Sequence, residues 1–156
     1  MKMFTSGAEA HIRYLAFAEA ADKEGHPDAA KILRAVAAAK MFLALSHFRA
    51  AKLLDGTSEN LKQAFEEESY DTRTAYPSMV QDAVKDEALE ARHSLEYGMS
   101  IGSVIMKLIS KAIGNSDSHE DGAYYICPEC GNIEFGKPPG KCPFCGVDAK
   151  DFVEVS

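Results

Sequence analysis

The sequence predicts a mainly α protein, in which a bundle of four helices is followed by a small metal-binding unit. Two observations lead to this fold class. As far as residue 114 the chain is rich in Ala, Leu, Glu and Lys, and its apolar residues recur at helical spacing. After a polar segment at 114–122 it becomes dense in Gly, Pro and Cys. We therefore expect a bundle over 1–116, a linker over 117–123 and a metal-binding domain over 124–156.

The first two helices have recognisable ends. Thr5 or Ser6 can cap the first helix, and Gly25 is a suitable stop. The second helix is expected to begin near Pro27, since proline is tolerated in a first turn, and to end at 55–56, the sequence "DG".

The third and fourth helices complete the predicted bundle. The third should begin at Thr57 or Ser58, and Pro77 should kink or split it because proline removes a helical hydrogen bond. The fourth should run from about Asp86 to Gly114. Four amphipathic segments joined by short connections favour a helical bundle.

Composition disfavours several classes of function. The net charge of −7 disfavours a nucleic-acid-binding protein, which would present a basic surface, and also disfavours adhesion to anionic membranes. The longest apolar stretch, at 101–114, is interrupted by Lys107 and Lys111 and is too short to span a bilayer. The chain does not open with a basic and then apolar leader, so we expect a soluble, cytoplasmic protein.

The strongest chemical signal is a pair of cysteine motifs. Cys127 and Cys130 form one Cys-Pro-x-Cys-Gly turn, and Cys142 and Cys145 form another. Each turn directs two sulfurs at one point, and the following glycine lets backbone N–H groups face the thiolates. Together the turns predict a closed, tetrahedral four-sulfur site for zinc or for a single redox-active iron. A zinc ribbon that only staples the C-terminal region is the alternative.

The C-terminal segment is too short for a large core, so we expect it to fold around its metal. The aromatic residues expected to supply a small core are Tyr124, Tyr125, Phe135, Phe144 and Phe152.

Several sequence segments give the chain a family resemblance over nearly its whole length. The helical part contains "YLAFAEAADKEG" (14–25), "ILRAVA" (32–37), "NLKQAFEEESYD" (60–71) and "YPSM" (76–79), and the tail contains both cysteine motifs. In this order they resemble the rubrerythrin family. The resemblance implies a ferritin-like four-helix bundle followed by a rubredoxin-like domain, often in a homodimer. It also implies peroxide reduction, with electrons delivered through the rubredoxin-like iron.

The resemblance further implies a di-iron centre in the bundle, but most of its ligands are replaced here. The corresponding positions are Gly7, Lys40, Leu43, Glu68, Asp71, Gly102 and Ile105. Only the two acidic residues could ligate iron in the family's manner. A Glu-x-x-His pair does occur at Glu90 and His93, but it lies about 18 Å along the helix from the expected place. We therefore expect no normal di-iron centre.

Two features suggest what takes the place of the irons. Lys40 lies on the apolar stripe of the second helix, where an unpaired charge is costly, and Glu68 is its expected partner. Ser94, Gly98 and Gly102 recur every four residues on the fourth helix, which favours close helix contact. The alternative is a small ligand pocket, for which the expected lining residues are Tyr14, Phe17, Met99 and Met106.

These features favour one function over two alternatives. The favoured function is one-electron transfer to an external redox protein through one four-cysteine iron, with no catalytic residue in the chain. One alternative is a peroxide-reducing enzyme with an atypical metal site among Glu66, Glu67, Glu68 and Asp71. The other is a structural or docking protein stapled by zinc.

Overall fold

The computed structural model describes residues 2–114 and 121–155. The chain divides into two compact units, Met1–Gly56 and Thr57–Ser156, and each is described by itself. Part of the predicted linker, at 117–120, lies outside the described residues. The domain boundaries expected from the sequence stay a prediction.

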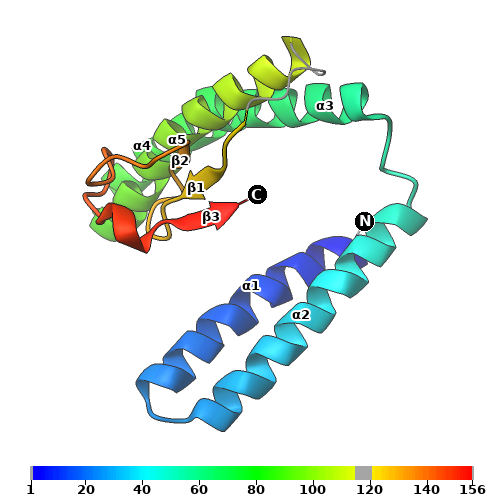
Figure 1. The fold of residues 1–156 in the computed structure, drawn as a ribbon, viewed down its shortest axis with the longest axis vertical. Helices are drawn as coiled ribbons and strands as arrows, with labels where there is room; N and C mark the ends of the chain where they lie inside the picture. The colour runs from blue at the N-terminus through cyan, green and yellow to red at the C-terminus, as the bar shows by residue number, and fades with distance from the viewer. Residues whose placement is uncertain (1, 115–120, 156) are drawn as a thin grey trace. The chain divides into compact units, whose positions relative to one another are not determined.

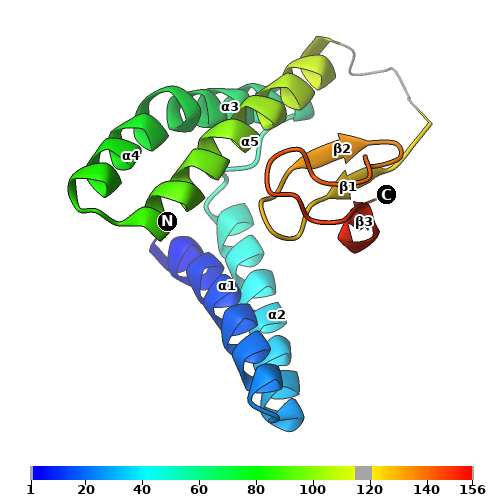
Figure 2. The same cartoon turned by 90° about the vertical axis from the view of Figure 1, so that its left-hand side faces the viewer.

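The first unit is a helical hairpin. Helix α1 (Lys2–Lys23) and helix α2 (Pro27–Ala50) lie side by side and antiparallel in both views (Figures 1 and 2). The fully buried residues along these helices are all alanines: Ala10, Ala18, Ala21, Ala30, Ala37 and Ala44. Such small side chains let two helix backbones approach closely. His11 adds a hydrogen bond from its Nδ1 to the carbonyl oxygen of Ala37 at 2.9 Å.

The ends of this hairpin differ in part from the sequence expectation. Helix α1 begins at Lys2, before the expected caps Thr5 and Ser6. Helix α2 does begin at Pro27, but it ends at Ala50 rather than at 55–56. The reason is that Lys52 has a left-handed backbone with φ of +54°, which a continuous helix cannot contain.

The second unit begins with a helix that changes type. Helix α3 (Thr57–Tyr70) passes into the π-helical turn η1 (Asp71–Ala75) and then into α4 (Tyr76–Lys85), which has Pro77 in its first turn. The sequence predicted a kink or split at Pro77, and the structure shows a change of helix type just before it, with no gap in the helical residues. Since proline lacks an N–H and its ring crowds the carbonyl four residues earlier, the wider turn before it accommodates the change.

Helix α5 (Leu89–Gly114) packs against α3, η1 and α4 (Figure 1). It begins three residues later than the expected Asp86, because Glu87 has a φ of +54°. Ile101 and Gly102 are its buried residues. Neighbouring elements approach closely at Gly102.

The C-terminal part of this unit is a small antiparallel sheet. Strand β1 (Tyr124–Ile126) lies between β2 (Ile133–Phe135) and β3 (Val153–Val155), and a short 3-10 helix, η2 (Ala149–Asp151), precedes β3. The rings of Tyr124 and Phe135 are in contact, with centroids 5.1 Å apart.

The residues buried in this sheet region differ from the expected aromatic core. Tyr124, Phe135 and Phe144 remain 38–40% exposed, whereas Cys127 and Cys142 are 1% and 3% exposed. The segment is therefore organised around its cysteines. The predicted mainly α fold class, with a small cysteine-bearing unit at the end, is confirmed. Among the described residues, no helix is both long enough and apolar enough to cross a membrane.

Candidate metal centre

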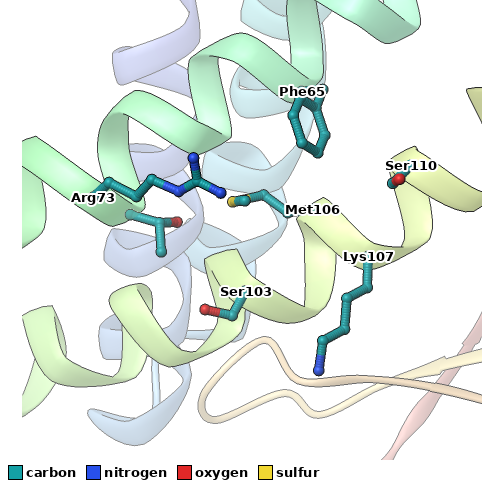
Figure 3. A pocket seen from close by; sticks show the side chains of 7 residues that line it. Phe65, Arg73, Ser103, Met106, Lys107 and Ser110 are labelled. Carbon is teal, nitrogen blue, oxygen red and sulfur yellow. The ribbon is translucent and has the colours of Figure 1, made fainter.

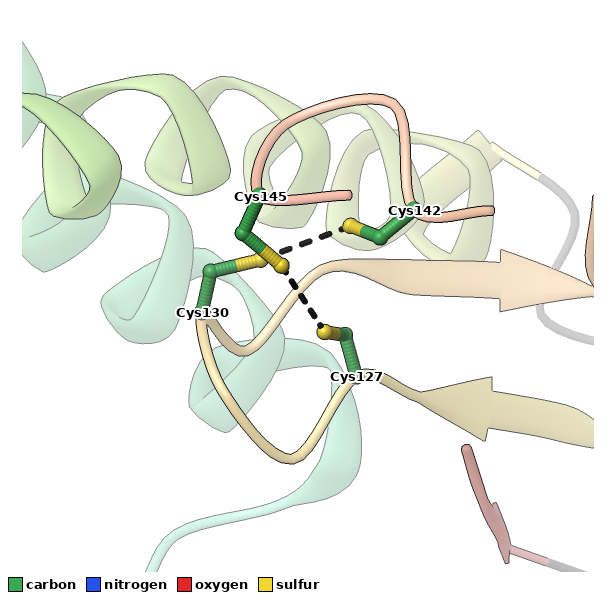
Figure 4. Close-up of side chains that lie close together, drawn as sticks. All are labelled: Cys127, Cys130, Cys142 and Cys145. Carbon is green, nitrogen blue, oxygen red and sulfur yellow. Dashed lines mark hydrogen bonds between the residues drawn. The ribbon is translucent and has the colours of Figure 1, made fainter. Parts of the chain in front are cut away.

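The four cysteines meet at the tips of two loops (Figure 4). Cys127 and Cys130 lie on the loop between β1 and β2, and Cys142 and Cys145 lie on the loop before η2. All four Sγ atoms lie within 4.8 Å of one another. The Cys127 and Cys145 sulfurs are 3.4 Å apart, and the Cys130 and Cys142 sulfurs are 3.6 Å apart.

The two loops repeat the same turn. Gly131 and Gly146 follow the second cysteine of each motif, with left-handed φ values of +77° and +81°. Their N–H groups donate to the carbonyl oxygens of Cys127 and Cys142, both at 3.0 Å. Because residues with a side chain rarely adopt this backbone conformation, glycine is the residue suited to each turn. The turn geometry expected from the motif is confirmed.

Backbone N–H groups also face the sulfurs. Burial raises the pKa of the Cys130 thiol, and the N–H of Asn132 partly opposes that effect. Burial also acts to raise the pKa of Cys142, but N–H donors of Cys145 and Phe144 bring it down to about 7. Such donors stabilise the thiolate, which is the form that binds a metal.

The distances between the sulfurs fit a tetrahedral metal. A metal–sulfur bond of about 2.3 Å corresponds to sulfurs about 3.8 Å apart in a tetrahedron, close to the separations between the loops. A disulfide would instead need about 2.05 Å, and all four cysteines are free. Zinc and iron both accept four thiolates. The donor set therefore fits one metal ion, and it leaves no open position for a substrate.

Within 2–114 and 121–155, the four cysteines are the only set of three or more potential ligands whose donor atoms converge in this way. Glu90 and His93, the Glu-x-x-His pair of the sequence, are both exposed on the first turns of α5.

In the first unit, the positions that the family resemblance matches to di-iron ligands lie where α1 and α2 approach closely. A Cβ atom built on Gly7 would lie 3.1 Å from the Cβ of Ala44 and 3.5 Å from the carbonyl oxygen of Lys40. Lys40 is half-buried, whereas Leu43 is exposed in this unit. The structure thus places Gly7 beside Lys40, and a side chain larger than hydrogen would crowd α2.

In the second unit, the positions that the family resemblance matches to di-iron ligands are packed more tightly. Gly102 is buried on α5, and a Cβ atom there would lie 2.1 Å from Thr72 Oγ1 and 3.6 Å from Glu68 Oε2. Thr72 therefore occupies the space that a side chain at Gly102 would need. Ile105 is half-buried one helical turn further along α5, and Asp71 is exposed on η1.

Glu68 lies in an environment that disfavours its charged form. Burial raises the pKa of its carboxyl group, and the negative charges of Asp71 and Glu67 raise it further. Lys40, its predicted partner, belongs to the other unit, so the ion pair between them stays a prediction.

Two positions in the second unit were not singled out as packing partners by the sequence pattern. The side chain of Thr72 opposes Gly102 directly. Asn132 is 1% exposed, and its Nδ2 donates to Glu134 Oε1 at 2.8 Å. No local sequence signal identifies either contact, because both depend on which residue lies opposite.

Similar proteins were found by sequence. No family model matches the chain. Rubrerythrin-2 of Clostridium acetobutylicum is 28% identical over 160 residues, covering 92% of this chain and 87% of that protein. Nigerythrin of Nitratidesulfovibrio vulgaris is 28% identical over 150 residues, covering 87% of this chain and 74% of the relative. This chain is a homologue of rubrerythrin-2 and nigerythrin.

Solved structures agree with this relationship. Nigerythrin in a mixed-valence state is 25% identical and superposes with a TM-score of 0.62, covering 99% of this chain and 83% of the other. The fully reduced, all-ferrous state of nigerythrin gives a TM-score of 0.63 at 24% identity, which supports the fold alone. The predicted fold of this rubrerythrin homologue, a ferritin-like helical region followed by a rubredoxin-like four-cysteine domain, is confirmed.

Proposed function

We propose that this rubrerythrin homologue transfers single electrons through one iron held by Cys127, Cys130, Cys142 and Cys145. The observation that carries the proposal is the closed convergence of four sulfurs within 4.8 Å. A metal surrounded by four protein thiolates has no open position for a substrate, so its available chemistry is electron exchange. Bound there, iron supplies a centre that cycles between its ferric and ferrous states.

The protein contributes the environment of that centre. Backbone N–H groups, including that of Asn132, donate to the sulfurs and so stabilise negative charge. Cys127 and Cys142 are buried, whereas Cys130 and Cys145 are only half-buried. The second pair therefore provides the route by which electrons enter or leave. We infer that the redox partner approaches on that side.

The choice of iron over zinc rests on the relatives. Nigerythrin has been characterised in mixed-valence and all-ferrous states, so that protein carries redox-active iron. The same donor set in a homologous chain favours the same metal. The zinc-stapled alternative remains distinguishable by metal analysis.

The second part of the proposal is that the helical region holds no normal di-iron centre. Four of the matched positions offer no side-chain atom that could ligate a metal: Gly7, Leu43, Gly102 and Ile105. At a fifth, Lys40, the ammonium group has no lone pair for a metal. The close contact between Gly102 and Thr72 adds a steric argument, since a ligating side chain would need that space. We infer that the helices serve in dimerisation and docking, and that the electron acceptor is an external protein.

Metal analysis combined with a visible spectrum tests this function. We expect the protein from iron-supplemented expression to contain about one iron per chain, to be coloured by thiolate-to-iron charge transfer, and to bleach reversibly with dithionite. Peroxide should not turn over at a rate typical of enzymes. Two or more irons per chain with peroxide turnover would instead support the peroxide reductase. A colourless zinc protein after iron reconstitution would support the structural alternative.

A further inference from the structure

A pocket of about 490 Å³ opens in the second unit, between α3, η1 and α5 (Figure 3). Its lining residues are Phe65, Thr72, Arg73, Ser103, Met106, Lys107 and Ser110. These comprise two cations, three hydroxyl groups and two apolar side chains, with no acidic residue. A positive lining is unusual in a chain of net charge −7, so it points to an anionic ligand.

Arg73 is the principal charged group of this pocket. Figure 3 shows its guanidinium group directed across the pocket toward Met106. Among the described residues it has no ion pair, whereas Arg92 on the same unit pairs with Glu96 at 2.7 Å. An unpaired guanidinium presents a planar set of donors that matches a carboxylate.

Arg73 reaches the pocket from the π-helical turn η1. Such turns are rare and occur often at functional sites. Thr72, the preceding residue of the turn, also lines the pocket, but its buried Oγ1 faces Gly102 of α5. Arg73 is therefore the charged donor that the turn supplies to this end of the pocket.

The rest of the pocket suits an aliphatic chain. The Phe65 ring projects into the pocket from α3, and Met106 adds a flexible apolar surface from α5 (Figure 3). From Ser103 to Ser110 the pocket follows two turns of α5, a length of about 10 Å. Lys107 points away from Phe65 and Met106, so it adds positive potential rather than a direct contact.

We propose that this pocket binds a medium-chain monocarboxylate. The carboxylate lies on the Arg73 guanidinium, and the chain lies along Met106 and Phe65. The volume falls within the range of small-molecule sites, about 300–1,000 Å³. The proposal does not depend on which metal the cysteines hold, because the pocket shares no residue with that centre.

Calorimetric titration of the full, metal-loaded chain with octanoate tests the proposal. We expect saturable binding with one octanoate per chain, and binding at least about tenfold weaker for Arg73→Gln, which keeps a polar side chain but loses the charge. Arg13→Gln is the matched control, since Arg13 is exposed on α1 and its loss changes the net charge equally. Acetate, which lacks the chain, and octanol, which lacks the charge, should each bind at least about tenfold more weakly than octanoate.

A second variant keeps the test independent of Arg73. Ser103→Phe should fill the pocket and abolish octanoate binding while the guanidinium remains, provided circular dichroism shows an unchanged helical signal. The proposal is overturned if Arg73→Gln binds octanoate as tightly as the unmodified chain, or if octanol binds equally well. Absence of saturable octanoate binding to the unmodified chain overturns it as well.

Discussion

The cysteine centre differs from the helical positions that the family resemblance matches to di-iron ligands. The difference lies in where along the chain the residues of each set come from. In the cysteine centre every donor belongs to one of two short turns of identical pattern, and all four sulfurs converge. The helical positions are spread over α1, α2, α3, η1 and α5, and glycine or an apolar residue stands at most of them. A site built from two local turns depends on residues close together in the chain, whereas a site distributed over several helices depends on residues from distant segments.

The two regions also differ in what they bury. The cysteine loops bury mainly their own ligands, so the segment depends on its metal. The helices instead pack small residues closely, with Ala44 against Gly7 and Thr72 against Gly102. The helical region therefore has a source of stability that needs no ion. Three changes test this difference, beginning with the largest expected effect.

Removing one ligand should disrupt the C-terminal domain. We expect Cys142→Ser to lose the metal and unfold this segment, because coordination by four cysteines can contribute on the order of 10 kcal/mol to folding. The helical signal in circular dichroism should remain, since α1 to α5 pack without the cysteines. Inductively coupled plasma mass spectrometry measures the metal content, and near-UV circular dichroism measures the loss of structure in this segment.

Pro143→Ala is the matched control for this ligand change. It alters the same loop but keeps all four sulfurs, and Pro143 is exposed. We expect this variant to retain its metal. If Cys142→Ser kept one tightly bound metal per chain with an unchanged spectrum, the cysteine centre would not be the metal site argued above.

The predicted Lys40–Glu68 pair gives the second test. We expect Lys40→Ala to lower the free energy of unfolding by about 3 kcal/mol near neutral pH, because it leaves a carboxylate in a desolvated site without its partner. Burial, Asp71 and Glu67 all raise the pKa of Glu68. Without Lys40 that raised pKa makes the folded state less stable at neutral pH, and the cost disappears as pH falls toward 4.5, where the carboxyl group takes up a proton.

Chemical denaturation of the variants at both pH values measures this effect. Lys31→Ala is the control, because Lys31 is exposed on the same helix. Adding Glu68→Gln to Lys40→Ala should recover most of the lost stability. If Glu68→Gln stabilised the unmodified chain and Lys40→Ala had no effect at either pH, the two residues would not be paired.

Much of the fold followed from local patterns. The starts of α2 and α3 followed from Pro27 and Thr57, and the change of helix type in the third segment lies just before Pro77. The cysteine turns were predictable because Cys-Pro-x-Cys-Gly contains both its ligands and the glycine that its backbone requires. Each of these features is determined by residues close together in the chain.

Features that depend on distant residues were less predictable. The left-handed residues Lys52 and Glu87 end or delay helices without any glycine to mark the place. The pairing of Thr72 with Gly102 joins residues thirty positions apart, and helical periodicity does not show which residues of two helices lie opposite each other. Of the residues expected to line a pocket, only Met106 lines this one, because the position of Arg73 depends on the π-helical turn and that of Phe65 on how α3 packs against α5.

The contact between Gly102 and Thr72 gives the third and smallest test. In a helix alanine is normally more favourable than glycine by about 1 kcal/mol. At Gly102, however, the added Cβ would meet Thr72 Oγ1 at 2.1 Å, so the threonine or the helix must shift. Since overpacking costs about 1–3 kcal/mol, we expect Gly102→Ala to lower the free energy of unfolding by about 1 kcal/mol overall. Urea denaturation measures it.

The design isolates the contact from helix propensity. Gly114→Ala, at the end of the same helix, meets no atom within 4 Å and should not destabilise the chain. Thr72→Ala removes the opposing hydroxyl, so the double variant should be more stable than the sum of the two single changes predicts. If the two changes were additive, or if Gly102→Ala stabilised the protein, the helices would retain room at this position. The steric part of the argument against a di-iron centre would then fail, and the argument would rest on the missing donor atoms alone.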